Sequence, residues 1–245
     1  MSNTTSATNN LVSLSGSPIY RHTEQKEWAP PQGEEFIEQI STHIEACIGP
    51  VETVLHEIIS DTVHIDVHVA KPSPNNPFIR LITSGMSDLP MATPEGAPVP
   101  RFSELMISLP AKWQLDQESM QDEQWYWPVR LLKYLARMPH KYSTWLGVGH
   151  TVPNGDPPTP FASNTKLCGA IILPSATTPA SFRALSIPGV KDIEFSAVVP
   201  LYEAEMNLKL RRGTDELLKL LDRHDVSDLV SPNRRDTTVK RFGLW

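Results

Sequence analysis

Three potential metal ligands alternate within one short segment of the chain. His64, Asp66 and His68 are spaced two residues apart, so a β-strand would project all three side chains from one face, with His56 a little upstream. Imidazole and carboxylate groups are common ligands of divalent metals, zinc in particular. Strand alternation alone also gathers polar side chains on a solvated face, and no His-Glu-x-x-His pattern accompanies them. The sequence therefore favours a structural role for this face over a metal site.

Motifs for a catalytic nucleophile or a bound nucleotide are incomplete. The Gly-x-Ser-x-Gly elbow of many hydrolases lacks at least one glycine around both Ser84 and Ser87. Neither Gly-x-x-x-x-Gly-Lys nor Gly-x-Gly-x-x-Gly follows an expected strand. We therefore predict that the protein is not an enzyme and needs no cofactor. One catalytic alternative stays open, a metal-assisted hydrolase that uses His64, Asp66, His68 and, as acid/base or supporting groups, His140 or His150.

The composition is that of an ordinary globular protein. Hydrophobic residues make up 40% of the 245 residues and charged residues 20%, unlike disordered or membrane-embedded chains. The net charge of -6 argues against a nucleic-acid partner, which needs a basic surface. Cys47 and Cys168 stand far apart, so neither a disulfide framework nor a zinc knuckle is expected. Because no secretory signal and no membrane-spanning apolar run is visible, we expect a cytoplasmic protein with no membrane partner.

Hydrophobic periodicity predicts helices and strands in irregular alternation. The expected elements are a helix from Glu34 to Cys47, strands over 62–70, 78–83 and 102–109, a helix from Trp127-Pro128 to Pro139, strands over 167–173 and 193–201, and a helix capped by Thr214. This order predicts one mixed α+β domain, mainly an antiparallel or mixed sheet packed with helices. We expect the domain over 32–230, a disordered arm over 1–31 and a basic tail over 231–245, either free or docked.

Aromatic residues are concentrated in one part of the chain, where Trp113, Trp125, Trp127 and Trp145 stand close together. Core packing explains such a concentration, because Trp side chains bury large areas. The alternative is a patch of anchor residues at a protein interface. Residues 142–166 have no clear period and are long enough to be a functional loop.

Several stretches carry a resemblance to a known family, and they occur in the family's order. They are Val54–Asp61 with Val63–Val67, Leu81–Met91, Glu104–Pro110, Trp127–His140 and Thr144–Asp156. Over about residues 34–222, the chain resembles the suppressor of fused family, specifically its bacterial single-domain members. The resemblance implies a compact mixed sheet-and-helix domain without catalysis, cofactor or metal. Related animal proteins grip a short peptide of Gli-type transcription factors, partly by strand addition, and bacterial members are associated with toxin neutralisation.

We therefore expect a cytoplasmic protein-binding domain, an immunity or sequestering protein whose partner is a protein such as a toxin encoded nearby. Asp88, Trp145, His150 and Asp156 are the expected contact residues, because they are polar or aromatic residues in loops on a scaffold. Pro90 stands where the animal proteins carry an aromatic residue of their peptide grip, so the animal partner is not expected here. A general scaffold or regulatory adaptor is a further alternative, and the sequence indicates no oligomeric state.

Overall fold

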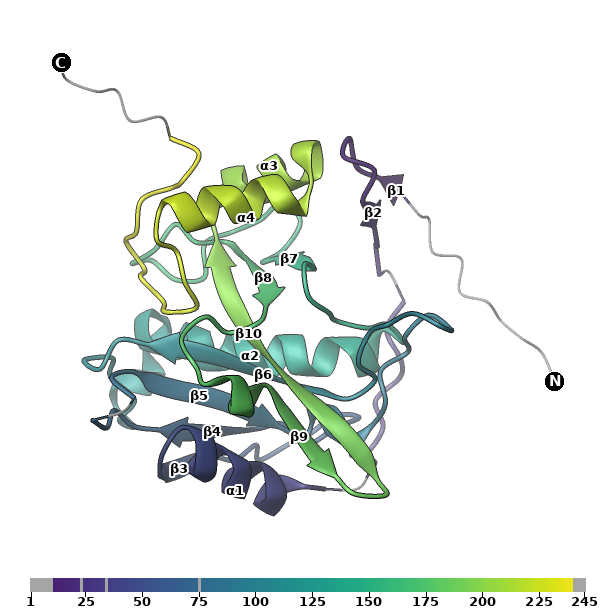
Figure 1. Cartoon of the computed structure of the whole chain (residues 1–245), viewed down its shortest axis with the longest axis vertical. Helices are drawn as coiled ribbons and strands as arrows, with labels where there is room; N and C mark the ends of the chain where they lie inside the picture. Colours follow the sequence, from purple (N-terminus) through teal and green to yellow (C-terminus); the bar gives the residue numbers. More distant parts are fainter. Residues whose placement is uncertain (1–10, 23, 34, 75, 240–245) are drawn as a thin grey trace.

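The computed structural model describes residues 11–22, 24–33, 35–74 and 76–239. Its centre is an eight-stranded sheet in the order β3-β4-β5-β6-β10-β8-β7, with β9 beside β10 (Figure 1). Neighbouring strands are antiparallel except β6 and β10, which are parallel. The strands are β3 (Val51–Leu55), β4 (Asp66–Ala70), β5 (Ile79–Ser84), β6 (Ser103–Leu109), β7 (Thr151–Pro153), β8 (Gly169–Leu173), β9 (Ala184–Ile187) and β10 (Lys191–Leu201). The predicted α+β class is confirmed.

Helices cover both faces of this sheet. Successive side chains of a strand point to opposite faces, and the central strands carry apolar side chains at both sets of positions, so both faces are apolar. Leu81 and Ile107 pack on the side of α2, whereas Ile82 and Met106 pack on the side of α1. The helices are α1 (Ile37–Cys47), α2 (Glu123–Lys141), α3 (Glu203–Arg212) and α4 (Thr214–Arg223), with short 3-10 turns η1 (Met86–Asp88), η2 (Ser119–Gln121) and η3 (Ala180–Arg183). Among the described residues, no helix is long and apolar enough to span a membrane.

The second helix begins earlier than the sequence pattern predicts. Trp127-Pro128 was the expected first turn, but α2 starts at Glu123. Asp122 caps it by accepting a hydrogen bond of 2.8 Å from the backbone N–H of Gln124. The Trp-Pro pair therefore lies inside the helix, where Trp127 is fully buried.

The polar face of β4 is buried, which corrects the expectation of a solvated strand face. The strand itself is shorter than the predicted 62–70, because it begins at Asp66. Asp66 and His68 are 3% and 0% exposed, since α1 packs over this side of the sheet. His68 Nε2 lies 2.9 Å from Ser84 Oγ on the neighbouring strand. Burial lowers the pKa of His68 to about 4, so its imidazole is neutral at pH 7.

The N-terminal segment is ordered from Leu11 and contacts the rest of the domain from Ser15, where the sequence predicted a disordered arm over 1–31. Residues 1–10 lie outside the described residues. A two-stranded ribbon, β1 (Leu11–Val12) and β2 (Pro18–Ile19), lies next to α3. Backbone hydrogen bonds then tie the segment to three parts of the domain: Ser15 N to Leu210 O, Lys26 N to Lys141 O, and Thr62 N to Ala29 O.

The C-terminal tail is docked over its described part, residues 231–239. The guanidinium of Arg234 pairs with the fully buried carboxylate of Glu205 on α3 and donates to the backbone oxygen of Pro200 at 3.0 Å. Thr237 Oγ1 donates to the same carboxylate at 2.8 Å. Burial opposes ionisation of Glu205, but the hydrogen bonds and charge of Arg234 outweigh it, so the pKa of Glu205 lies below its usual value.

Candidate protein-binding surface

Two of the four predicted contact residues, Trp145 and His150, form an aromatic cluster in the loop between α2 and β7. Their ring centroids lie 5.5 Å apart at an interplanar angle of 62°. Backbone hydrogen bonds fix the loop on β8, from Gly149 N to Ile172 O at 2.8 Å and from Ile172 N to His150 O at 3.0 Å. Burial and the nearby charge of Lys209 lower the pKa of His150, so a neutral imidazole packs beside a half-buried tryptophan.

Asp156 lies apart from this cluster, on an exposed turn after β7. Asn154 fixes the turn, because its side-chain amide donates to the backbone oxygen of Thr159 at 2.7 Å and its N–H donates to Cys168 O at 2.8 Å. The carboxylate of Asp156 is 4.0 Å from the guanidinium of Arg21, and the two side chains are 83% and 63% exposed. Such an ion pair contributes at most about 1 kcal/mol, so a partner can displace it.

Asp88 is buried, unlike the half-buried Trp145 and His150 and the exposed Asp156. It ends the turn η1, which Gly85 enters with a φ of 105°. The backbone of Gly33 covers it so closely that a Cβ on Gly33 would lie 2.5 Å from the Asp88 carbonyl oxygen. Burial, followed by repulsion from Glu104, raises the pKa of Asp88 to about 7, although Lys191 opposes the shift. The structure therefore places Asp88 beneath the surface as a titrating group of the scaffold.

One segment, residues 20–22 and 24–33, links these separated places, and we call it the N-terminal strap. It runs along one side of the molecule from β2 to α1 (Figure 1). Its contacts with the predicted surface are Tyr20 edge-on to Trp145 with centroids 5.1 Å apart, Arg21 beside Asp156, His22 stacked on Tyr142 at 5.3 Å, and Gly33 over Asp88. The strap could not be predicted from the sequence, because it has no hydrophobic period. The triplet Tyr20-Arg21-His22 was the one local sign of a binding segment.

The predicted metal set of His64, Asp66 and His68 does not come together. His68 is turned into the core, and His56 takes its place beside Asp66. His56 Nδ1 lies 2.9 Å from Asp66 Oδ2, and His64 Nε2 lies 3.0 Å from Asp66 Oδ1. His140 is buried elsewhere and bonds a backbone carbonyl at 2.8 Å. The constellation expected for a metal-assisted hydrolase is therefore not assembled.

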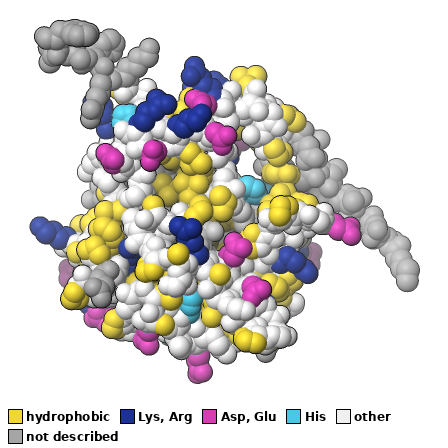
Figure 2. All heavy atoms as spheres, viewed as in Figure 1, with side chains coloured by type: hydrophobic (Ala, Val, Ile, Leu, Met, Phe, Trp, Pro, Cys, Tyr) yellow, Lys and Arg dark blue, Asp and Glu magenta, His cyan; other side chains and the backbone are white. Residues whose placement is uncertain are grey.

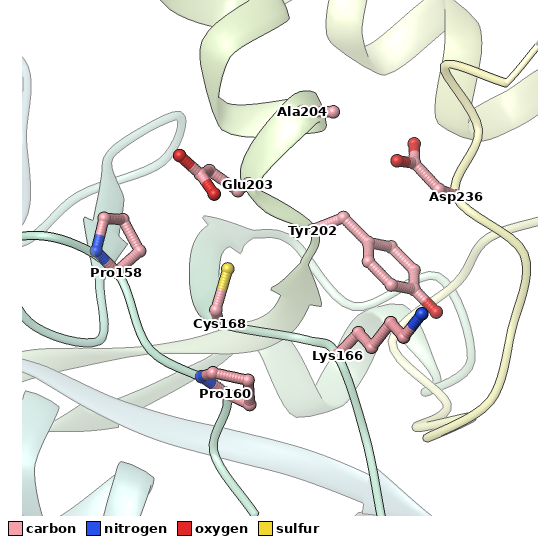
Figure 3. Close-up of a pocket in the computed structure, with 8 residues that line it drawn as sticks. All are labelled: Pro158, Pro160, Lys166, Cys168, Tyr202, Glu203, Ala204 and Asp236. Carbon is pink, nitrogen blue, oxygen red and sulfur yellow. The ribbon is translucent and has the colours of Figure 1, made fainter.

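A recess of about 310 Å³ lies at the start of α3 (Figure 3). Cys168 forms part of its wall, and burial raises the pKa of that thiol, so it stays protonated and weakly nucleophilic at pH 7. The hydroxyl of Tyr202 donates to the backbone oxygen of Arg234 instead of facing a substrate. Glu203 and Lys166 contribute charges of opposite sign. The described lining therefore contains no activated nucleophile.

The remaining surface gives few signs of a specific ligand. Acidic and basic side chains are interspersed on the face seen in Figure 2, and hydrophobic ones gather between α4 and β10. The half-buried residues of that cluster include Leu173, Leu218 and Val226. They cover the core cluster below α3 and α4 and form no enclosed pocket among the described residues.

The family model and the solved structures that this chain resembles all point to the same family. Residues 61–235 match the family model described as Suppressor of fused protein (SUFU). A structure described as a SUFU homologue from Neisseria gonorrhoeae superposes with a TM-score of 0.59 at 14% identity, covering 83% of this chain and 97% of that one. The structure of the Sufu-Fu complex gives 0.56 at 15% identity, covering 82% and 90%. Drosophila Suppressor of Fused gives 0.53 at 14% identity, covering 89% and 54%. No curated protein sequence matches significantly.

Proposed function

The chain belongs to the suppressor of fused family, and we propose that it acts by binding another protein and not by catalysis. Known members of the family are protein-binding regulators without enzymatic activity, and the Sufu-Fu complex is one such assembly. The structural observations on this chain agree with that role. Its buried His68 and His140 are held in core hydrogen bonds, and burial raises the pKa of the Cys168 thiol in the wall of the recess, so none of the three is an activated catalytic group.

The N-terminal strap is the observation that carries the proposed binding surface. Tyr20 and Arg21 lie on Trp145 and Asp156, so this surface already accommodates an irregular segment with an aromatic and a basic side chain. With the segment in place, Trp145 is half-buried and the side chain of Asp156 is 83% exposed. We therefore place the partner on the same surface, with an aromatic anchor against Trp145 and a cation near Asp156.

A partner that uses this surface must first displace the strap. An edge-on aromatic pair contributes about 0.5–1.5 kcal/mol and an exposed ion pair at most about 1 kcal/mol. Displacing Tyr20 and Arg21 therefore costs about 0.5–2.5 kcal/mol, which weakens the apparent affinity roughly 2- to 70-fold. Removal of residues 1–22 should strengthen partner binding by that factor.

The specific role within this function is that of an immunity or sequestering protein in the cytoplasm that neutralises a toxin encoded nearby. The test is to co-express the product of the neighbouring gene with this chain and to measure both complex formation and relief of toxicity. The immunity role requires a stable complex and restored growth. A complex without restored growth would support a scaffold or adaptor instead, and failure of both would reject the immunity role.

The binding surface is tested separately with matched variants. Trp145→Ala should weaken the complex by more than about 30-fold, because buried Trp anchors at interfaces contribute about 2 kcal/mol or more. Asp156→Ala should weaken it by about 2- to 5-fold, as expected for an exposed charge. Glu216→Ala on α4 is the control, because its side chain is partly exposed and pairs with exposed Lys219. If Trp145→Ala folds normally and keeps full affinity, the partner binds elsewhere.

A further inference from the structure

Two histidines and an aspartate converge where the β3–β4 hairpin opens. The hairpin pairs Leu55 with Val67, so the next residue on each strand, His56 and Asp66, face each other. His64 reaches the same carboxylate from the turn before β4. The candidate ligand atoms of the three side chains lie within 4.8 Å of one another. We propose that His56, His64 and Asp66 bind a divalent transition-metal ion, with zinc the best match to this donor set.

The interatomic distances are close to those that a zinc ion needs. Zinc bonds of about 2.0–2.1 Å in tetrahedral geometry place neighbouring donor atoms roughly 3.3 Å apart. The two nitrogen–oxygen distances from His56 and His64 to Asp66 are 2.9 and 3.0 Å. The two histidines contact different oxygens of the carboxylate, so one of these side chains has to shift for a single ion to reach all three groups, and the exposed ring of His56 is the one with room to do so.

Supporting hydrogen bonds hold two of the three ligands in place. Ser60 Oγ lies 2.6 Å from His64 Nδ1, which leaves Nε2 directed at Asp66. The backbone N–H of Glu57 donates to Asp66 Oδ1 at 3.0 Å. Such partners of the ligands orient metal sites in proteins and preserve the tautomer that binds the ion. The carboxylate is anchored in the core, whereas the side chain of His56 is 64% exposed, so an ion can enter from solvent.

The position of the site indicates a structural role. His56 and Asp66 stand at the two ends of the connection between β3 and β4, and a shared ion would close that loop at its base. Within the loop, Val63 and Ile65 on the β4 side are fully buried, whereas Ile58 and Ile59 nearer β3 are 98% and 82% exposed, so burial of apolar side chains does little to constrain the β3 side. A metal ion would supply that constraint. The site is independent of the surface around Trp145 and of the proposed partner.

Metal titration of the untagged, full-length protein tests the proposal. After chelator treatment and dialysis, calorimetric titration with Zn²⁺ should give one ion per chain. At about 100 times the dissociation constant, the melting temperature should rise by roughly 5–10 °C. Co²⁺ should give the visible absorption of a tetrahedral site. His56→Ala and His64→Ala should abolish these effects, while His224→Ala, at the end of α4, should retain them.

The controls separate this site from adventitious binding. His56→Ala also removes a hydrogen-bond partner of the buried Asp66, so the metal-free melting temperature of each variant is measured first and the effect of Zn²⁺ is taken as the shift from that value. His43 and Cys47 form the obvious competing pair, with Nδ1 and Sγ 4.0 Å apart. Binding that persists in His56→Ala and disappears in Cys47→Ser would overturn the proposal. The same conclusion follows if the wild-type protein binds none of the ions.

Discussion

Replacing Asp228 by Asn should strongly destabilise the fold, because several chain segments converge on this one buried charge. Its Oδ2 accepts hydrogen bonds from Ser108 at 3.1 Å, Ser175 at 2.8 Å and Thr177 at 2.8 Å. The guanidinium of Arg80 lies 3.6 Å away. The side chains of Arg80 and Asp228 are 2% and 1% exposed, so water cannot replace the lost charge.

The magnitude follows from the burial of the pair. Removing one partner of a buried ion pair costs about 3–5 kcal/mol, since the other charge remains uncompensated. In a domain of this size, each kcal/mol lowers the melting temperature by about 2–4 °C. The melting temperature of Asp228→Asn should therefore fall by roughly 6–20 °C. Urea unfolding followed by circular dichroism measures the free energy directly, and its m value should stay constant.

Two further variants serve as controls for the loss of stability in Asp228→Asn. Glu216→Gln removes one charge of an exposed pair with Lys219 and should change the unfolding free energy by less than about 0.5 kcal/mol. Arg80→Met combined with Asp228→Leu removes both buried charges and should recover part of the loss, because no charge is left unpaired. A loss below about 1 kcal/mol for Asp228→Asn would refute the reasoning that this carboxylate neutralises Arg80 in the core.

Three further outcomes test other parts of the structure. Gly85→Ala should lower the unfolding free energy by more than about 2 kcal/mol, because φ is 105° and a Cβ would lie 1.8 Å from the His64 carbonyl oxygen; urea curves that superpose would contradict this. Asp88→Asn should flatten the pH dependence of stability. The pKa of Asp88 is about 7 in the folded state and 3.8 in the unfolded state, so between these pH values the native state binds more protons. The wild-type free energy of unfolding therefore falls as pH rises from 4 to 7. If wild type and variant show the same slope of unfolding free energy against pH, the raised pKa of Asp88 is rejected. Tyr20→Ala should speed hydrogen exchange in residues 142–150 with little change in global stability, and unchanged exchange would show that the strap does not protect that loop.

The spacing of hydrophobic residues predicted those helices and strands whose buried face is apolar along its whole length. Ile40 and Ile44 of α1 are fully buried at the predicted helical spacing. Apolar residues on both faces of 102–109 predicted a central strand, and β6 lies between β5 and β10. Both patterns arise because apolar side chains face the core, and they are the same whichever helix or strand packs against them.

The sequence could not predict contacts that depend on which element covers another. Alternation showed that Asp66 and His68 share a strand face, but only the packing of α1 makes that face buried. His56 reaches Asp66 because β3 pairs with β4, and β3 has no clear period in the sequence. The strap was missed for the same reason, since Tyr20 packs on a loop whose position requires the complete fold.

One of the stretches that carry the family resemblance, Leu81–Met91, belongs to the scaffold over most of its length. From Leu81 to Asp88 every residue is buried. Glu104 explains two of them, since its fully buried carboxylate accepts hydrogen bonds from Thr83 Oγ1 at 2.6 Å and from Ser87 Oγ at 2.7 Å. The same stretch becomes exposed only at Pro90. Such a stretch fixes a buried network and carries no information about a partner. The proposed partner surface lies in another of these stretches, Thr144–Asp156, where Val148 is 57% exposed and the side chain of Asp156 83% exposed, so the proposal rests on the chemistry of that loop.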